Sequence, residues 1–508
     1  MPRRESLISK AKALFPDLIE TVTRPVRTVI PERAGERFIA EEDVDYSNIR
    51  LKAGDKLYLD FGDHVTGYLT LDFDFSGSHP DAPVWLRIKF AERLSEFFEN
   101  VSEYSGWISK SWIQEEQIHV DVMPSTYGLE RRYAFRYVEI EVLDISSKYE
   151  LIVSDAVCRS VSSADDEKLI SYRSEDERLD RLDKIAVRTL HECMQKVFED
   201  GPKRDRRLWM GDLRLEALAN YGTYRQNDLV KECLYLFGGD TLSDDRIGAS
   251  LFIEPEIAVD DVSMFDYSLF FPVVLLDYVK QTKDEEALDD LYEIAVRQVY
   301  LAKEQVGEDG VVKDSDKIGW CFVDWNMELN KQASAQGIYL YALKAAMELA
   351  DMCSDDERKE ELTLEYERAV AAARQYFFDM ETGVFVSGSV KQISWASQCW
   401  MILGGAVSVE EGNAIMDRMK GISDVINMVT PYMYHHYISA LIILGRDEEA
   451  KETIKDYWGG MEAEGADTFW ELYRPGFPDE SPYGGTIVNS YCHAWSCAPA
   501  YFIRKYGW

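Results

Sequence analysis

The stretch SEDERLDRLDKIAVRTLHECMQKVF, residues 174–198, marks the point where the pattern of the sequence changes from strand-like to helix-like. Ser174 and Glu177 have the spacing of a capping box and predict the start of a helix, and Ser354 and Glu357 predict a second start in the same way. The apolar side chains of the stretch recur every three or four residues, as on one helix face: Leu179, Leu182, Ile185, Ala186, Thr189, Leu190, Cys193 and Val197.

The same spacing recurs downstream and predicts about eleven or twelve helices, near 172–197, 211–225, 228–237, 266–282, 285–305, 333–352, 355–378, 393–405, 409–420, 430–444, 447–459 and 488–504. About twelve helices with short connections match six helical hairpins in a ring. A stacked solenoid would give a similar count, but no fixed-period repeat is present. In a ring, the longer non-helical stretches would gather at one mouth and form a site: 198–212, 240–265, 310–332 and 462–487.

Upstream of residue 165 the sequence alternates between apolar and polar side chains. YLTLDFDF (68–75), VWLRIKF (84–90) and FRYVEIEVL (135–143) each predict a half-buried strand. Turn-forming residues separate the strands at 76–83 and 123–128. This pattern predicts an antiparallel β-sandwich. We therefore expect an N-terminal extension packed on the other domains at 1–50, a β-sandwich at 51–164 and a helical domain at 165–508.

The composition excludes several kinds of partner. The 508 residues carry a net charge of −36, which disfavours nucleic acid and anionic membranes because their phosphates would be repelled. The eight cysteines are dispersed without a zinc spacing and suggest a reducing compartment. The N-terminus lacks a long apolar segment and no run of 18 apolar residues occurs, so a cytoplasmic location is expected.

Most catalytic templates are missing from the sequence. There is no Gly-x-Ser-x-Gly turn, no phosphate-binding loop, no Gly-x-Gly-x-x-Gly after a strand and no His-Glu-x-x-His. With seven histidines in the chain, metal-based or histidine-based catalysis is unattractive, and neither a metal nor a cofactor is expected. Chemistry performed by carboxylates is what remains.

One candidate group lies in EDGPKRDRRLWMGDLR, residues 199–214, where Asp200, Asp205 and Asp212 alternate with arginines. Arginines at this spacing orient carboxylates, and Asp212 falls in the first turn of a helix, where the helix dipole favours its charge. The alternative is a solvated helix start with surface salt bridges, which contribute little.

Two further groups stand later in the chain. Glu471 lies among Phe469, Trp470 and Tyr473, and a poorly solvated carboxyl group should have a raised pKa, as suits a general acid or base. The alternative is a glutamate that points to water. In GWCFVDWNMELN (319–330), Asp324 and Trp325 are able to present a carboxylate and a ring face to a sugar, or else the tryptophan is a core residue.

Three segments together resemble glycoside hydrolase family 78, the bacterial α-L-rhamnosidases. DGPKRDRRLWMGD resembles the family's first motif, TFWELY resembles its Trp-Glu motif, and NSYCHAWS resembles the Asn-Ser segment that follows. The resemblance spans about residues 55–508 and implies a multidomain β + α protein, with an N-terminal antiparallel β-sandwich followed by an (α/α) six-hairpin barrel. The residues that match the first motif are Asp200, Pro202, Arg204, Arg206, Gly211 and Asp212.

The resemblance also implies site residues and an inverting mechanism. Asp205 occupies the position of the general acid, where the family usually has Glu, and Glu471 occupies that of the general base. An inverting pair needs room for a water molecule, so the carboxyl groups should lie roughly 6.5–9.5 Å apart. The residues that the resemblance assigns to substrate binding are Asp200, Arg204, Trp209, Asp212, Asp324, Trp325, Trp470 and His493.

The implied activity is the hydrolysis of terminal α-L-rhamnosyl residues from glycosides or oligosaccharides, with a carbohydrate as the only expected ligand. The family usually continues into another β domain, whereas this sequence stops at Trp508, so a more open pocket or a homodimer is a further expectation. Two alternatives remain: an inverting hydrolase for a different α-linked sugar, and a sugar-binding barrel without turnover.

Overall fold

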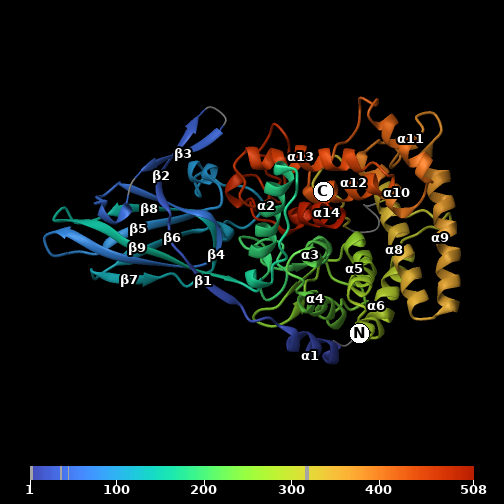
Figure 1. Ribbon diagram of the computed structural model, residues 1–508, viewed down its shortest axis with the longest axis horizontal. Coiled ribbons are helices and arrows are strands. Elements are labelled where there is room, and N and C mark those ends of the chain that lie inside the picture. The colour runs from blue at the N-terminus through green and yellow to red at the C-terminus, as the bar shows by residue number, and fades with distance from the viewer. Residues whose placement is uncertain (1–3, 35–36, 44, 315–319) are drawn as a thin grey trace.

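The computed structural model describes residues 4–34, 37–43, 45–314 and 320–508. A β domain built on one antiparallel sheet is followed by a helical domain (Figure 1). The strands of the sheet are β1 (Ile19–Thr23), β2 (Arg27–Ala34), β3 (Arg37–Asp43), β4 (Lys56–Gly77), β5 (Val84–Ala91), β6 (Glu115–Val120), β7 (Ser125–Gly128), β8 (Tyr133–Asp144) and β9 (Tyr149–Ser162).

The long strand β4 organises the sheet, whose main order is β1-β9-β4-β8-β5-β6. Its first half pairs with β8 and its second half with β9. Leu69, Leu71 and Phe73 are buried in the core of the β domain, whereas Thr70 and Asp72 between them are only half-buried, which confirms the predicted strand.

Two expectations about the β domain need correction. Strands β1, β2 and β3 belong to the sheet, so the domain begins before residue 51, and only helix α1 (Glu5–Leu14) extends away from it to pack on the helical domain. The expected turn at 123–128 contains β7, which pairs with β4 through residues 125–128. These strands lack the regular alternation of apolar and polar side chains by which a strand is recognised in a sequence.

The helical domain is an array of paired helices (Figure 1). Its helices, among the described residues, are α2 (Glu177–Cys193), α3 (Met210–Gly222), α4 (Asn227–Gly239), α5 (Phe265–Thr282), α6 (Glu285–Lys303), α8 (Gln332–Met352), α9 (Asp356–Phe377), α10 (Trp395–Gly404), α11 (Val409–Met419), α12 (Pro431–Ile443), α13 (Asp447–Ala463) and α14 (Ala498–Tyr506). These correspond to the predicted helices within a few residues, with one exception.

The exception is the last helix, which begins at Ala498 rather than near residue 488. Residues 488–497 instead form a loop that ends in a short 3₁₀ segment, η6 (Ala494–Cys497). Both predicted capping boxes are also wrong. Asp176 caps α2 and Asp355 caps α9, because an Asp one or two residues closer to the helix accepts the free backbone N–H groups.

Alternate helices form an inner ring. Contacts run from α3 to α5, α8, α10 and α12, and return to α3 through η6 and α14, while α2, α4, α6, α9, α11 and α13 lie outside. Inner helices such as α5 and α10 are buried on nearly all faces, as their apolar sequences require. In α8, a Cβ on Gly337 would lie 2.5 Å from the backbone of Trp400, so glycine allows α8 and α10 to pack closely.

Three carboxylates of the β domain reach across to the helical domain. Glu96 and Glu92 lie 2.5 Å and 3.6 Å from the ammonium group of Lys203, which is buried. Glu99 accepts hydrogen bonds from the backbone N–H groups of Thr486 and Ile487. The β domain therefore holds the two loops, 198–209 and 464–493, that bear most residues of the three motifs found in the sequence.

All eight cysteines are free thiols. In the part of the chain that the structure describes, no helix has an apolar run that would cross a membrane.

Candidate active site

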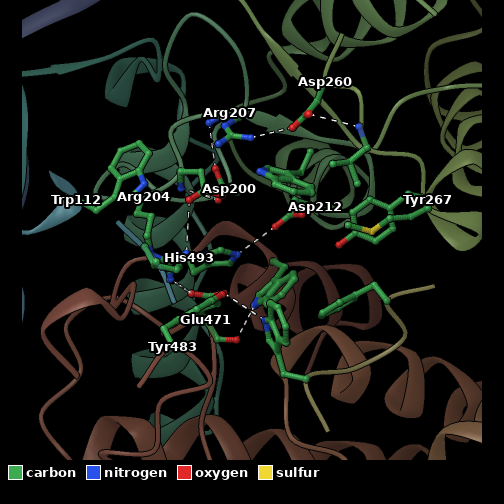
Figure 2. A pocket seen from close by; sticks show the side chains of 18 of the residues that line it. Trp112, Asp200, Arg204, Arg207, Asp212, Asp260, Tyr267, Glu471, Tyr483 and His493 are labelled. Carbon is green, nitrogen blue, oxygen red and sulfur yellow. Dashed lines mark hydrogen bonds and ion pairs between the residues drawn. The ribbon is translucent and has the colours of Figure 1, made fainter. Parts of the chain in front are cut away.

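A cavity of about 380 Å³ opens where the loops of the helical domain meet the β domain (Figure 2). Much of its lining comes from the expected stretches 198–212, 240–265, 310–332 and 462–487, of which residues 315–319 lie outside the described part of the chain, while the rest comes from residues 107–112, Tyr267, His493 and Trp495. The ionisable side chains of the lining are Asp200, Arg204, Asp205, Arg207, Asp212, Asp260, Glu471 and His493, and its aromatic rings are Trp107, Trp112, Trp209, Tyr267, Trp320, Phe322, Trp325, Tyr483 and Trp495.

Asp200 folds the loop that carries Asp205. One carboxylate oxygen of Asp200 accepts the backbone N–H of Asp205 at 2.9 Å, and the other accepts that of Arg207 at 3.1 Å. A Cβ on Gly201 would lie 2.6 Å from the carbonyl oxygen of Arg204, so the tight loop requires glycine there. Burial and the charge of Asp205 raise the pKa of Asp200 to about 8.

The arginines of this loop point in three directions. Arg204 turns inward, Arg206 donates to the carbonyl oxygens of Pro202 and Arg132, and Arg207 lies 3.0 Å from Asp260. Only the Arg204 guanidinium approaches Asp205 among these three, at 3.6 Å. The charge alternation in the sequence therefore does not make one salt-bridge cluster around Asp205.

Arg204 contacts both candidate catalytic carboxylates. Its Nη2 atom lies 2.6 Å from Glu471, and its Nε atom donates to the carbonyl oxygen of Val488 at 2.8 Å. Because one planar guanidinium reaches both groups, the facing oxygens of Asp205 and Glu471 are at most roughly 9 Å apart. The two residues, 266 positions apart in the chain, thus face one cavity.

Glu471 is surrounded by donors as well as by aromatic rings. It accepts hydrogen bonds from the Tyr483 hydroxyl and, at 3.3 Å, from the indole N–H of Trp325. Burial raises the pKa of Glu471, but the charges of Arg204 and His493 and the hydrogen bonds from Tyr483 and Arg204 outweigh burial and leave the pKa below its ordinary value. The expected rise is therefore wrong, because Arg204 was not recognised as its partner.

Asp212 and His493 form a second pair on the cavity floor. The His493 Nε2 atom lies 3.2 Å from Asp212, and its ring packs 4.4 Å from that of Trp495. Burial lowers the pKa of His493, yet Asp212 and Glu471 raise it above its ordinary value overall. The Trp209 Nε1 atom is buried without a hydrogen-bond partner among the described residues, so a bound ligand would satisfy it.

Two expected substrate-binding residues do not line the cavity. Asp324 accepts the backbone N–H groups of Val429 and Thr430, both at 2.9 Å, and thereby fixes the loop that carries Trp325. Trp470 is buried beneath the guanidinium of Arg93, 4.7 Å from its ring. Their contacts support a role in holding the cavity wall, not contact with a sugar.

Comparison with known proteins identifies the kind of barrel. Residues 167–506 match the bacterial α-L-rhamnosidase six-hairpin glycosidase domain, and residues 20–160 match the N-terminal domain of the family 78 α-rhamnosidases. The chain belongs to glycoside hydrolase family 78. Its fold is therefore the six-hairpin glycosidase fold preceded by the family's β domain, as the motifs implied.

Solved structures of the family resemble the whole chain. A rhamnosidase from Klebsiella oxytoca, determined with rhamnose bound, is 42% identical over 100% of this chain and 99% of its own, with a TM-score of 0.97. A family 78 rhamnosidase from Bacillus sp. GL1 is 20% identical, with a TM-score of 0.76 over 92% of this chain and 49% of its own, which shows the fold alone. The comparison with curated proteins gave no match.

Part of the cavity lining was not predicted. Tyr483 lies in a loop rich in Gly and Pro, where no periodicity distinguishes it, and Asp260 has no motif around it. Trp107 and Trp112 belong to the β domain, in SGWISKSW (105–112). Two tryptophans in a serine-rich loop were the available signal, but nothing in the sequence connects that loop to the barrel.

Proposed function

We propose that the protein is an inverting α-L-rhamnosidase in which Asp205 is the general acid and Glu471 the general base. The observation that carries this proposal is the contact of Arg204 with both carboxylates inside one cavity. The upper limit of roughly 9 Å on their separation accommodates the roughly 6.5–9.5 Å of an inverting pair. A guanidinium between the two groups favours the wider separation that a water molecule needs.

In this mechanism each carboxyl group has one role. Asp205 is the more exposed of the two, with 20% of its side chain accessible, and donates its proton to the glycosidic oxygen as the bond to the anomeric carbon breaks. Glu471, kept ionised by Arg204, accepts a proton from a water molecule that attacks the opposite face of that carbon. The sugar leaves with its anomeric configuration inverted.

Asp212, His493 and Trp209 are proposed to hold the sugar. The buried indole N–H of Trp209, which has no partner among the described residues, suits a sugar hydroxyl group, as does the Asp212 carboxylate, and the ring of Trp325 offers an apolar face. L-Rhamnose is proposed as this sugar because the Klebsiella oxytoca rhamnosidase, 42% identical, was solved with rhamnose bound.

Hydrolysis of 4-nitrophenyl α-L-rhamnoside, followed by NMR of the first sugar released, tests the proposal. β-L-Rhamnose as the first product supports inversion, whereas α-L-rhamnose excludes it. Glu471→Gln should lower kcat by about 10²–10⁴ with rhamnose binding retained. Release of a different sugar from a panel of α-glycosides would favour the first alternative, and binding without turnover would favour a non-catalytic barrel.

We further propose a cytoplasmic location and a division at about residue 165. Eight free thiols favour a reducing compartment. The division is supported by the end of β9 at Ser162 and the start of α2 at Glu177. The homodimer stays a prediction, which size-exclusion chromatography with light scattering will test.

A further inference from the structure

A second pocket, separate from the candidate active site, lies at the junction of the two domains. Its volume is about 360 Å³, and its walls come from strands β4, β9 and β11 (Ser250–Phe252) and from the loop that follows α2. The charged side chains of its lining are Arg132, Lys196, Glu199, Arg206 and Glu254. More of these are basic than acidic, in contrast to the chain as a whole, whose net charge is −36.

Arg206 turns from the loop of the candidate acid into this pocket. Its φ of 63° lies in the left-handed region, which is strained for a residue with a side chain. Two hydrogen bonds hold the guanidinium, from Nε to the carbonyl oxygen of Pro202 at 2.8 Å and from Nη2 to that of Arg132 at 2.7 Å. Asp205 and Arg207, on either side in the chain, line the candidate active site instead. The loop therefore presents one cation to the second pocket.

The positive charge of Arg206 has no counter-ion in the described part of the chain. Both of its hydrogen-bond acceptors are uncharged carbonyl groups. The carboxylates nearby already serve two other guanidinium groups, since Glu116 lies 2.9 Å from Arg131 and Glu199 lies 2.6 Å from Arg132. Burial and then the charge of Arg132 lower the pKa of Arg206 to about 10. A largely buried cation without an anion is unfavourable, so an anionic ligand would stabilise it.

The rest of the lining defines the kind of anion. Lys196 pairs at 2.7 Å with Glu254, but both are exposed, so the lysine is able to exchange this weak contact for a stronger anion. A phosphate group, with up to two negative charges and three acceptor oxygens, matches a guanidinium and an ammonium group together. The pocket exceeds the size of a phosphate, and the rings of Tyr68 and Phe252 also line it. What fits is a small organic molecule that bears a phosphate group.

We propose that the pocket around Arg206 and Lys196 is a second ligand site, for a small phosphate-bearing organic molecule, behind the loop that carries Asp205. The proposal does not depend on the proposed glycosidase function, because neither cation lines the candidate active site. Since Arg206 adjoins Asp205 in the chain, a ligand held there contacts the same loop without occupying the sugar site.

Calorimetric titration of the full-length protein at constant ionic strength tests the proposal, with glucose 6-phosphate, inorganic phosphate, glucuronate and glucose as probes. Glucose 6-phosphate should bind with a Kd of about 1 mM or lower, more tightly than the other three, and L-rhamnose should not compete with it. Arg206→Gln should raise this Kd roughly 10- to 100-fold, as expected for a lost charge-assisted hydrogen bond. Lys196→Glu, on the surface and outside the loop, should raise it about tenfold. Lys184→Glu is the matched control, because this exposed lysine does not line the pocket.

A Kd that Lys196→Glu and Lys184→Glu raise equally would overturn the proposal, because the phosphate would then respond to the overall charge and not to this pocket. Glucose that binds as tightly as its phosphate would reject it too, as would tighter binding of glucuronate, which would assign the site to carboxylates. Loss of binding in excess L-rhamnose would place the ligand in the sugar site. No saturation by glucose 6-phosphate below about 10 mM would leave Arg206 with a purely structural role. Hydrolysis of rhamnosides is measured separately, so either proposal is able to fail without the other.

Discussion

The guanidinium of Arg204 lies 2.6 Å from the carboxylate of Glu471, and both side chains are almost fully buried. A buried ion pair of this kind keeps the carboxylate ionised in surroundings that would otherwise favour its neutral form. Because the same guanidinium approaches Asp205 at 3.6 Å, it connects the two carboxyl groups that the proposed mechanism requires.

Arg204→Met should narrow the pH range of activity from the acidic side. Without the positive charge, burial raises the pKa of Glu471, so the proposed base becomes protonated at a higher pH and activity is lost first at low pH. The acidic limb of the plot of kcat/KM against pH should shift to higher pH. Arg204→Lys, which keeps the charge, should shift it less. An unmoved limb in Arg204→Met would show that Glu471 does not control it.

Asp205→Asn should affect substrates according to their leaving groups. A general acid matters most when the leaving group is a poor one, so kcat/KM for methyl α-L-rhamnoside should fall by about 10²–10⁴. For 2,4-dinitrophenyl α-L-rhamnoside, whose phenolate leaving group departs without a proton, we expect kcat/KM to fall about tenfold or less. Similar losses for both substrates would argue that Asp205 binds the sugar and is not the acid, and Asp200 would become the candidate.

Lys203→Met should destabilise the junction of the two domains. The change leaves the buried carboxylate of Glu96 without its cation, whereas Glu92 keeps its contact with His64 at 2.9 Å, and such a loss costs about 3–5 kcal/mol. Thermal unfolding measures it, and Lys184→Met, which removes an exposed pair with Asp180, should cost about 0.5 kcal/mol or less. Adding Glu96→Gln to Lys203→Met should restore part of the lost stability; a double variant no more stable than the single one would contradict this account.

Gly337→Ala should weaken the packing of α8 against α10. The added methyl group would stand 2.5 Å from the Trp400 backbone, and overpacking of this kind costs about 1–3 kcal/mol. Gly222→Ala is the control, because a Cβ there would meet no atom closer than 3.6 Å and alanine favours a helix. Denaturant unfolding of both variants gives the comparison, and equal stabilities would refute the close approach.

The local sequence predicted most of the elements because their signals are short-range. The apolar spacing in α5 or α10 and the alternation in β4 depend on residues a few positions apart, so the sequence pattern predicts these elements without knowledge of the fold. The prediction of a helix from residue 488 failed because apolar residues there, such as Tyr491 and Trp495, are buried in a loop that ends in a 3₁₀ segment and do not form one face of an α-helix. Apolar content alone does not distinguish the two.

The sequence by itself determined the motifs, the two-part architecture and the carboxylates that act as candidates, Asp205 and Glu471. The tertiary structure decided the rest: the lowered pKa of Glu471, the positions of Asp324 and Trp470 outside the cavity, and the wall that Trp107 contributes from the β domain. The physical reason is that charge and burial at a site depend on partners hundreds of positions away. Only folding brings Arg204 to Glu471, and only folding places a β-domain loop at the mouth of a helical barrel.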